Sequence, residues 1–203
     1  MLKIIEQAKG IDVFNIFKES GAIFEGHFKL TSGMHSGVYM QCAKLLQYPD
    51  RAGRLARAAA EMLSKDIDMG KVDTVISPAV GGILWGYIFA YRTEKKMIFT
   101  ERADGEMQLR RGFELKEGEK VIVAEDVITT GGSVKEVIKI CEGRGAEVAG
   151  IISIVDRNSG VDFGYPYYNM LKIDIEIYEP GQCPMCSKGQ EIVYPGSKDS
   201  RTF

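Results

Sequence analysis

The chain is organised around one run near its middle, Val121-Ile122-Val123-Ala124-Glu125-Asp126-Val127-Ile128-Thr129-Thr130-Gly131-Gly132-Ser133-Val134. Four apolar residues open the run, which is typical of a strand buried on both faces. Two acids follow, and then a polar loop that contains two glycines. The spacing of an amphipathic helix comes next, at Val134, Val137, Ile138 and Cys141. The predicted order is therefore strand, acids, glycine loop and helix.

The glycine loop has the features of a phosphate-binding site. The first N–H groups of a helix lack partners within the helix, and the helix dipole makes that end positive. Two glycines let the backbone approach an anion closely, and the hydroxyl groups of Thr129, Thr130 and Ser133 add donors. Glu125 and Asp126 would repel a phosphate, so they suit sugar hydroxyls or a metal ion attached to it. A phosphorylated sugar satisfies both halves of the run.

Each half of the run also has an ordinary structural explanation. The two acids could be solvated residues at a strand end, and the Thr-Thr-Gly-Gly segment could be a helix N-cap turn. The whole run in this order favours the ligand site over that interpretation. The run contains neither GxxxxGK[ST] nor GxGxxG, so it is not a Walker loop or a dinucleotide fingerprint.

Composition limits the class of protein. A chain of 203 residues with 45% hydrophobic content predicts one domain with a proper core. A net charge of −2 argues against a nucleic-acid-coating protein, and no run reaches the roughly 18 apolar residues of a membrane span. Four cysteines in a chain of this length do not indicate a disulfide framework. We expect a cytoplasmic protein with no nucleic-acid or membrane partner.

The N-terminal part of the chain predicts helices and short strands. A short helix is expected over residues 2–8. Asp12 can cap a second helix, in which Val13, Ile16 and Phe17 share a face and after which Gly21 provides the stop. Short strands with glycine turns between them are expected over residues 22–24, 27–33 and 37–41. An alanine-rich helix is expected over residues 50–63.

The rest of the chain alternates between strand and helix patterns. Strands are expected over 72–77, 97–100 and 148–155, and residues 83–92 are apolar almost all round, which predicts a buried helix. Residues 101–118 predict a long exposed loop, with room for a hairpin at its base. The helix after the glycine loop should end at 143–145. This alternation predicts an α/β fold with a parallel sheet and right-handed crossovers.

In such sheets ligands bind outside the carboxyl ends of the strands. Four polar clusters follow predicted strands and should meet along one rim: 78–82, Glu101-Arg102, 125–133 and Asp156-Arg157. This convergence follows from the sheet geometry alone.

At these residues the sequence resembles the type I phosphoribosyltransferases, whose signature for phosphoribosyl pyrophosphate (PRPP) is a hydrophobic strand, two acids, two apolar residues and Thr-Thr/Ala-Gly. The resemblance implies a single domain over 1–203, with a parallel-sheet α/β core over approximately 50–170. It also implies a small hood built from the N-terminal segment and the C-terminal tail, approximately 1–45 and 170–203. The signature does not choose the nucleobase.

Residues 26–33 resemble the N-terminal motif of the orotate phosphoribosyltransferases, and Val38-Tyr39 lie in the aromatic-containing strand that follows it. Arg157 resembles the family's orotate-contacting arginine and Thr129 its orotate-contacting threonine. Arginine suits this role because its planar fork binds a carboxylate bidentately. The alternatives are an ion pair of Arg157 with Asp156 or Asp162, and an ordinary exposed position for Lys29. The family often has lysine at the position of Thr31, for which Lys29 could substitute because residues i and i+2 share a strand face.

The resemblance implies transfer of phosphoribose from PRPP to orotate, giving orotidine 5′-monophosphate and pyrophosphate in pyrimidine biosynthesis. Glu125, Asp126 and Arg102 are the implied catalytic residues. The resemblance also implies a flexible loop over residues 102–111. The implied substrate-binding residues come from the phosphate loop, a pyrophosphate loop and this flexible loop, together with two further cations: Val127, Ile128, Thr129, Thr130, Gly131, Gly132, Ser133, Ala79, Val80, Gly81, Arg110, Arg111, Lys29 and Arg157. Mg²⁺ would be bound mainly through PRPP. A homodimer that shares the flexible loop across its interface is expected.

Two other functions remain possible on the sequence: a PRPP-binding transcriptional regulator, and transfer to a purine base. A solvated charge run is the alternative for the loop arginines. Cys183-Pro-Met-Cys186 supplies two of the four ligands of a structural zinc site. Cys42, Cys141, His27 and His35 are not at zinc-finger spacing from it. We therefore expect reduced thiols in a turn and no metal held by protein ligands.

Overall fold

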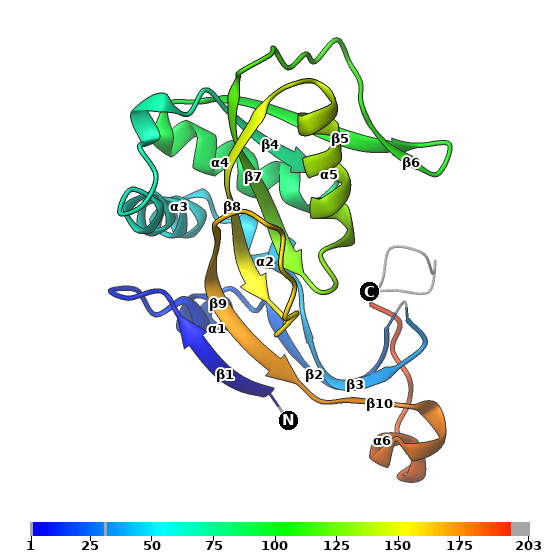
Figure 1. Ribbon diagram of the computed structural model, residues 1–203. Helices are drawn as coiled ribbons and strands as arrows, with labels where there is room; N and C mark the ends of the chain where they lie inside the picture. Colours follow the sequence, from blue (N-terminus) through cyan, green and yellow to red (C-terminus); the bar gives the residue numbers. More distant parts are fainter. Residues whose placement is uncertain (1, 31, 196–203) are drawn as a thin grey trace.

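A seven-stranded sheet forms the centre of the protein (Figure 1). The structure is a computed structural model that describes residues 2–30 and 32–195. In spatial order the strands are β1 (Leu2–Gln7), β9 (Tyr167–Ile175), β8 (Glu147–Asp156), β7 (Lys120–Ile128), β4 (Thr74–Pro78), β5 (Lys96–Ala103) and β6 (Glu106–Leu109). The five inner strands run parallel, and the edge strands β1 and β6 are antiparallel to their neighbours. The predicted parallel α/β fold is confirmed.

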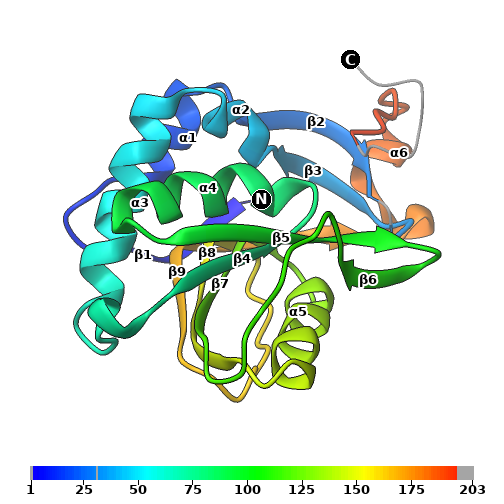
Figure 2. The ribbon, with the colours of Figure 1, turned by 90° about the horizontal axis from the view of Figure 1, so that it is seen from above.

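Helices cover both faces of this sheet (Figure 2). One face carries α1 (Val13–Glu19), α2 (Cys42–Leu46), α3 (Pro49–Leu63) and α4 (Gly81–Thr93), and the other carries α5 (Gly132–Gly143). A single turn of 3₁₀-helix, Met69–Lys71, precedes β4. None of the helices in the described ranges is long and apolar enough to cross a membrane.

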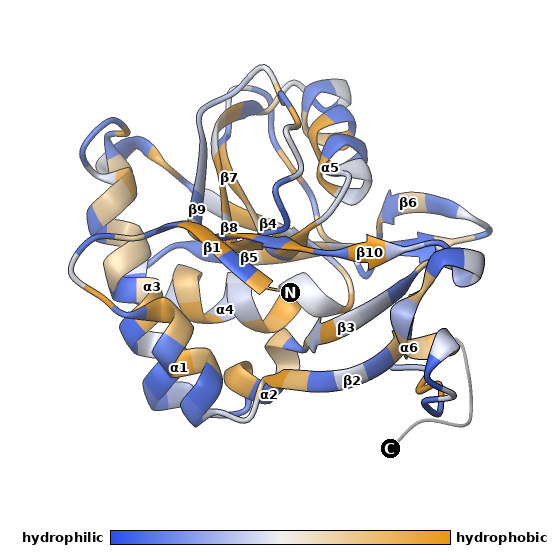
Figure 3. Cartoon of the chain, turned by 90° about the horizontal axis from the view of Figure 1, so that it is seen from below, coloured by the Kyte–Doolittle hydropathy of each residue, from blue (hydrophilic) through white to orange (hydrophobic). Residues whose placement is uncertain are grey.

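Alternate side chains of the central strand β7 are apolar on both faces of the sheet, so helices are needed to cover both faces. Ile122 and Ala124 point into the core beneath α3 and α4, whereas Val121 and Val123 point into the core beneath α5. All four side chains are fully buried, because successive residues of a strand face opposite sides of the sheet. Hydrophobic residues accordingly fill β7 (Figure 3).

A second, three-stranded sheet stands apart from the first, as Figures 1 and 2 show. It consists of β2 (Ile23–Lys29), β3 (His35–Met40) and the short β10 (Ile177–Tyr178), all antiparallel. The chain continues through a 3₁₀ turn, Pro180–Gln182, into the short helix α6 (Pro184–Ser187). The predicted hood corresponds to this region, but β1 and β9 belong to the large sheet, so the approximate boundaries of the hood remain a prediction. Thr31 and residues 196–203 lie outside the described residues.

Several local predictions are confirmed. Asp12 caps α1 by accepting a hydrogen bond from Asn15 N at 3.0 Å, and Gly21 follows the helix with a positive φ of 60°. The loop predicted over 101–118 contains the hairpin of β5 and β6 at its base.

The helix predicted over residues 2–8 is wrong. This segment is strand β1, which pairs with β9 from Leu2 opposite Ile175 to Gln7 opposite Leu171. The β-branched pair Ile4-Ile5 favours a strand, and the free edge of β9 supplies hydrogen bonds that the sequence could not reveal. Helix α2 was not predicted, because five residues are too few for a helical period to be recognised.

The composition of helix α4 predicted a helix buried on all sides, and this prediction is wrong. Trp85 and Phe89 are fully buried, but Leu84, Tyr87 and Tyr91 are 53%, 63% and 67% exposed. The exposed side chains follow each other at i, i+3 and i+7, so they form one apolar stripe on the outer face of the helix.

Candidate active site

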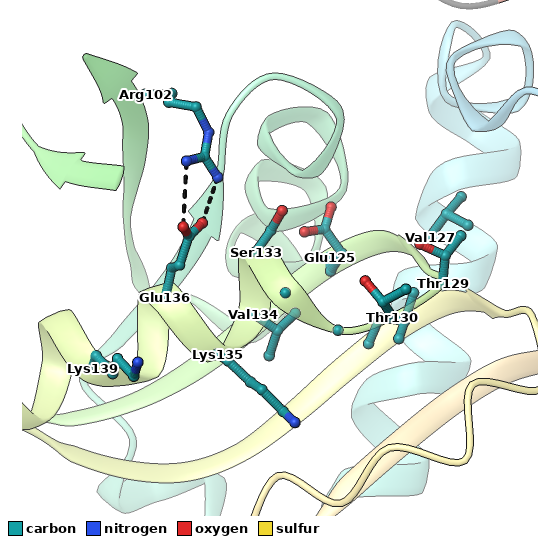
Figure 4. Close-up of a pocket in the computed structure, with 13 residues that line it drawn as sticks. Arg102, Glu125, Val127, Thr129, Thr130, Ser133, Val134, Lys135, Glu136 and Lys139 are labelled. Atoms are coloured by element: carbon teal, nitrogen blue, oxygen red, sulfur yellow. Dashed lines mark hydrogen bonds and ion pairs between the residues drawn. The ribbon is translucent and has the colours of Figure 1, made fainter. Parts of the chain in front are cut away.

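Glu125 and the glycine loop line one cavity at the carboxyl end of β7 (Figure 4). The second acid, Asp126, is not among the lining residues. The volume of the cavity is about 430 Å³. The lining residues come from β5, β7, the loop and the first turns of α5: Arg102, Glu125, Val127, Ile128, Thr129, Thr130, Gly131, Gly132, Ser133, Val134, Lys135, Glu136 and Lys139. The structure thus brings together the whole predicted phosphate loop, Glu125 and Arg102. Lys135, Glu136 and Lys139 were not predicted, because they lie on the helix beyond the motif.

The N-terminus of α5 is built for an anion. Gly131 is the N-cap residue and has φ = 74°, a conformation that favours glycine. The ring of Phe163 would lie 2.8 Å from a Cβ at this position, so the loop also passes too close to its neighbour for a side chain. The amides that follow Gly131 open α5, where a helix has no internal acceptor for them.

The two acids occupy different environments. Glu125 is buried and its Oε1 accepts a hydrogen bond from Asp126 N at 3.2 Å; Asp126 Oδ1 accepts one from Val127 N at 2.9 Å. Burial, followed by the charge of Asp126, raises the pKa of Glu125 well above its ordinary value. A cationic or hydroxyl-bearing ligand next to this pair would relieve the repulsion between the carboxyl groups.

The loop after β4 packs directly against the acids. A Cβ on Gly81 would lie 2.7 Å from both carboxylate oxygens of Asp126, and one on Gly82 would lie 3.4 Å from Glu125 Oε1. The peptide between Ala79 and Val80 is cis. Ala79 N donates to Thr100 O at 2.7 Å. Of the three amides predicted to meet pyrophosphate, those of Val80 and Gly81 therefore remain available.

Arg157 follows β8 and joins the same rim. Its backbone N–H donates to Ile128 O at 2.9 Å, and its partly buried guanidinium has a pKa that is lowered by burial and partly restored by Tyr39. Within the described ranges, no carboxylate lies within ion-pair distance of Arg157. Asp156 and Asp162 instead accept backbone N–H groups of Ser159 and Gly164, each at 2.8 Å. The structural ion pair considered for Arg157 is absent from this part of the chain.

Sequence reasoning missed two residues at the rim, Tyr39 and Cys42. Burial, Asp126 and Cys42 raise the pKa of half-buried Tyr39, and Arg157 partly offsets the rise. Cys42 is buried with Sγ 3.8 Å from Asp126 O, and burial followed by Asp126 and Glu125 raises its pKa well above its ordinary value. The aromatic residue in strand β3 was the available signal for Tyr39. Cys42 had none.

The remaining predicted cations contact other side chains of the protein. Arg102 forms a bidentate ion pair with Glu136 of α5, as Figure 4 shows. Arg110 and Arg111 pair with Glu101 at 3.5 and 2.8 Å. Lys29 Nζ lies over the ring of Tyr194, 5.8 Å from its centroid. Lys29, Arg110 and Arg111 are not among the residues that line the cavity.

The chemistry of the rim also bears on a metal ion. It offers the adjacent carboxyl groups of Glu125 and Asp126 but, among the described residues, no cluster of three or more candidate ligands. The one such cluster in residues 2–30 and 32–195 lies in the three-stranded region, outside this cavity. Two carboxylates suit Mg²⁺, which keeps several waters and substrate oxygens in its coordination sphere.

A family model and individual relatives of similar sequence both match this chain. Residues 43–185 match the family described as "Phosphoribosyl transferase domain". An orotate phosphoribosyltransferase of Caldicellulosiruptor saccharolyticus is 49% identical over 184 residues, which are 90% of this chain and 94% of that protein. One of Thermotoga maritima is 46% identical, over 90% of this chain and 96% of that protein.

Solved structures show the same fold. The orotate phosphoribosyltransferase of Aeropyrum pernix superposes with a TM-score of 0.64 at 25% identity, over 79% of this chain and 94% of that one. An adenine phosphoribosyltransferase of Saccharomyces cerevisiae has a TM-score of 0.62 at 15% identity, over 78% and 99% of the two chains. The fold is thus shared by enzymes named for different bases.

Proposed function

Because this chain belongs to the orotate phosphoribosyltransferases of the phosphoribosyl transferase family, we propose that its strand-end cavity transfers phosphoribose from PRPP to N1 of orotate. The products are orotidine 5′-monophosphate and pyrophosphate, a step of pyrimidine biosynthesis. The observation that carries the assignment of the cavity is the placement of Glu125 and the N-terminus of α5 in one 430 Å³ space. One donor, a phosphorylated sugar, matches both.

The glycine loop binds the 5′-phosphate in this proposal. Residues Thr129 to Ser133 supply backbone amides at the positive end of α5 and hydroxyl donors around them. Glu125 and Asp126 bind the ribose hydroxyls. Their positions are fixed by the backbone hydrogen bonds at Asp126 N and Val127 N, so the sugar meets prearranged acceptors.

The bond between ribose C1 and pyrophosphate breaks with cationic character on the sugar ring. N1 of orotate forms the new bond, and its proton leaves with the pyrophosphate. Negative charge from Asp126 and Glu125 stabilises this oxocarbenium-like centre. The raised pKa of Glu125 favours its protonated form, and a cationic centre that develops beside it opposes this protonation. Orotate is aligned by Arg157, whose guanidinium is free of carboxylate partners in the described part of the chain and meets the orotate carboxylate.

In this proposal pyrophosphate leaves towards the loop after β4 and the loop that carries the arginines. Val80 and Gly81 offer backbone amides, while Arg102, Arg110 and Arg111 supply positive charge. Each arginine now pairs with Glu101 or Glu136, so closure over the donor exchanges a glutamate for a phosphate oxygen. Closure also excludes water, which protects PRPP from hydrolysis. Lys29 is a further candidate for this role, from the hood.

Mg²⁺ is the proposed cofactor. Asp126 and Glu125 would hold it together with oxygens of PRPP and water, which agrees with the two-carboxylate chemistry of the rim. When bound, it neutralises charge on the pyrophosphate group. Removal of Mg²⁺ should therefore abolish turnover while the fold is kept.

The assay that tests the function follows absorbance with PRPP, Mg²⁺ and one base at a time: orotate, uracil or hypoxanthine. Turnover of orotate alone is expected, because only orotate carries a carboxylate for Arg157. Turnover with hypoxanthine alone would show that the substrate is a purine base and not orotate. PRPP binding without turnover of any base would instead support a regulator that senses PRPP.

Arg157→Ala is expected to raise KM for orotate by about 10- to 200-fold, equivalent to the roughly 1.5–3 kcal/mol of a charged hydrogen-bonded pair. KM for PRPP should change less than threefold, because PRPP has no contact with this guanidinium in the proposal. Steady-state kinetics with each substrate varied in turn measure the two values. Arg144→Ala, at the end of α5, is the control. Equal loss for both substrates would remove the assigned role of Arg157.

The proposed assembly is a homodimer that shares the flexible loop. Its support is the apolar stripe Leu84, Tyr87 and Tyr91 on α4, because a stripe of this kind is normally covered. Leu84→Glu combined with Tyr87→Glu should convert the dimer to a monomer in light scattering and lower turnover. Lys65→Glu, an exposed change on another surface, should leave both unchanged. A monomeric wild-type enzyme with full activity would contradict the shared loop.

We also place the enzyme in the cytoplasm. None of the four cysteines forms a disulfide, which suits a reducing compartment.

A further inference from the structure

Four side chains from distant parts of the sequence meet in the hood. They are His27 in β2, His35 at the start of β3, Cys183 at the N-cap of α6, and Cys186 within α6. One ligand atom from each lies within 4.8 Å of the other three. His27, His35 and Cys183 are buried, and Cys186 is partly so. Two histidines and two cysteines at this separation are the donor set of a structural zinc site.

Three sulfur–nitrogen distances in the cluster are close to those of tetrahedral coordination. Cys183 Sγ and Cys186 Sγ lie 3.5 and 3.6 Å from His27 Nε2, and Cys186 Sγ lies 3.2 Å from His35 Nδ1. Zn–S and Zn–N bonds of about 2.3 and 2.0 Å put sulfur and nitrogen ligands roughly 3.5 Å apart. The two nitrogens, 2.8 Å apart, need to separate by roughly half an ångström to reach the tetrahedral spacing.

Hydrogen bonds alone do not satisfy this cluster. His27 Nδ1 lies 2.9 Å from Gln190 O, and a carbonyl only accepts, so Nδ1 carries the proton. In the neutral ring, Nε2 then has one lone pair, yet it faces His35 and both cysteines. A metal ion between the four atoms accepts one lone pair from each of them at once. The bond from Nδ1 to a backbone carbonyl is also the usual outer contact that orients a histidine ligand.

The segment that carries the cysteines has little else to hold it. Within 179–195, only Cys183 and Pro195 are buried, so the segment contributes almost nothing to a hydrophobic core. Helix α6 has four residues, far too few to be stable alone. Small units without a core depend on a disulfide or a metal. The backbone does join the hairpin on both sides of Phe28: Val193 N donates to His27 O at 2.8 Å, and Lys29 N donates to Val193 O at 3.0 Å.

We propose that His27, His35, Cys183 and Cys186 bind one Zn²⁺ ion, which fastens the C-terminal segment to the β2–β3 hairpin. Four protein ligands leave no open position, so the ion is structural. It stabilises the hairpin that carries Lys29 and Tyr39. The expectation of reduced thiols in a turn rested on zinc-finger spacing. Cys186 and His35 are 151 residues apart, and only the fold brings them together.

Metal analysis of the untagged wild-type protein tests the proposal. We expect about one zinc per chain after gel filtration, and loss of it in Cys183→Ser and in Cys186→Ser. Cys141→Ser is the matched control, since Cys141 is also buried but lies in α5; this variant should keep its zinc. Wild-type protein that contains no zinc after expression and purification in zinc-supplemented medium would overturn the proposal.

A spectroscopic readout avoids dependence on the folding of the variants. Wild-type protein stripped with a chelator and reloaded with Co²⁺ should show the visible absorption of tetrahedral cobalt and a thiolate charge-transfer band. Limited proteolysis should cut within 179–195 only after stripping. Absence of the thiolate band, or a mass showing that Cys183 and Cys186 are joined as a disulfide in fresh protein, would each contradict the site.

Discussion

Replacing Asp126 with asparagine is expected to lower kcat by about 10²–10³-fold, the range for loss of one prearranged electrostatic contact to a transition state. The substitution keeps the size of the side chain and an oxygen that can accept from Val127 N, now at 2.9 Å. It removes the charge that faces the developing cation on ribose. Circular dichroism and thermal melting should show an unchanged fold, and single-turnover kinetics should show a slower chemical step.

Asp68→Asn is the matched control for this experiment. Asp68 also accepts a backbone N–H, from Gly70 at 3.1 Å, but lies at an exposed turn before β4. Its replacement should leave kcat within a factor of about two, since exposed substitutions away from a site change energies by less than about 0.5 kcal/mol. Full activity of Asp126→Asn would show that the charge at this position does not act on the reaction.

Gly131→Ala is expected to damage both the stability of the protein and the binding of PRPP. The residue adopts φ = 74°, and the added Cβ would lie 2.8 Å from Cε1 of Phe163, a buried ring. The left-handed conformation costs about 1–2 kcal/mol and the overpacking about 1–3 kcal/mol. Denaturant unfolding should therefore show a loss of about 2–5 kcal/mol. KM for PRPP should rise by tenfold or more, on the order of 1.4 kcal/mol, because the phosphate loop must shift.

Gly118→Ala separates the two causes. Gly118 has nearly the same backbone angle, φ = 73°, but a Cβ added there would meet no atom within 4 Å. This variant should lose only the conformational part, about 1–2 kcal/mol, and should bind PRPP normally. If the two variants had equal stability and equal KM for PRPP, the close packing of Gly131 against Phe163 would have no part in the site.

Much of the site could be predicted because it is continuous in sequence. Buried strand, acids and glycine loop lie within residues 121–134, and local chemistry specifies each part. The rim positions of the 78–82 loop and of Arg157 followed from the rule that parallel strands end at one edge. The positions of Glu125 and Asp126 beside the loop at Gly81 agree with that rule.

Features that depend on tertiary partners could not be predicted. Strand β1 exists because β9 offers it an edge. The pairing of Arg111 with Glu101 depends on the β5–β6 hairpin. Tyr39 reaches the rim from the second sheet, and the cluster of His27 with Cys183 forms only when the C-terminal segment folds back. Periodicity along one strand or helix carries no information about such contacts.

In the proposed site, carboxyl groups hold the sugar while neighbouring amides hold its 5′-phosphate. A crystal structure with PRPP and Mg²⁺ bound would show this arrangement or exclude it. We expect the 5′-phosphate within hydrogen-bond distance of the amides of residues 129–133, and the ribose hydroxyls against Glu125 and Asp126. A donor bound elsewhere, or a ribose ring that touches neither carboxylate, would contradict it.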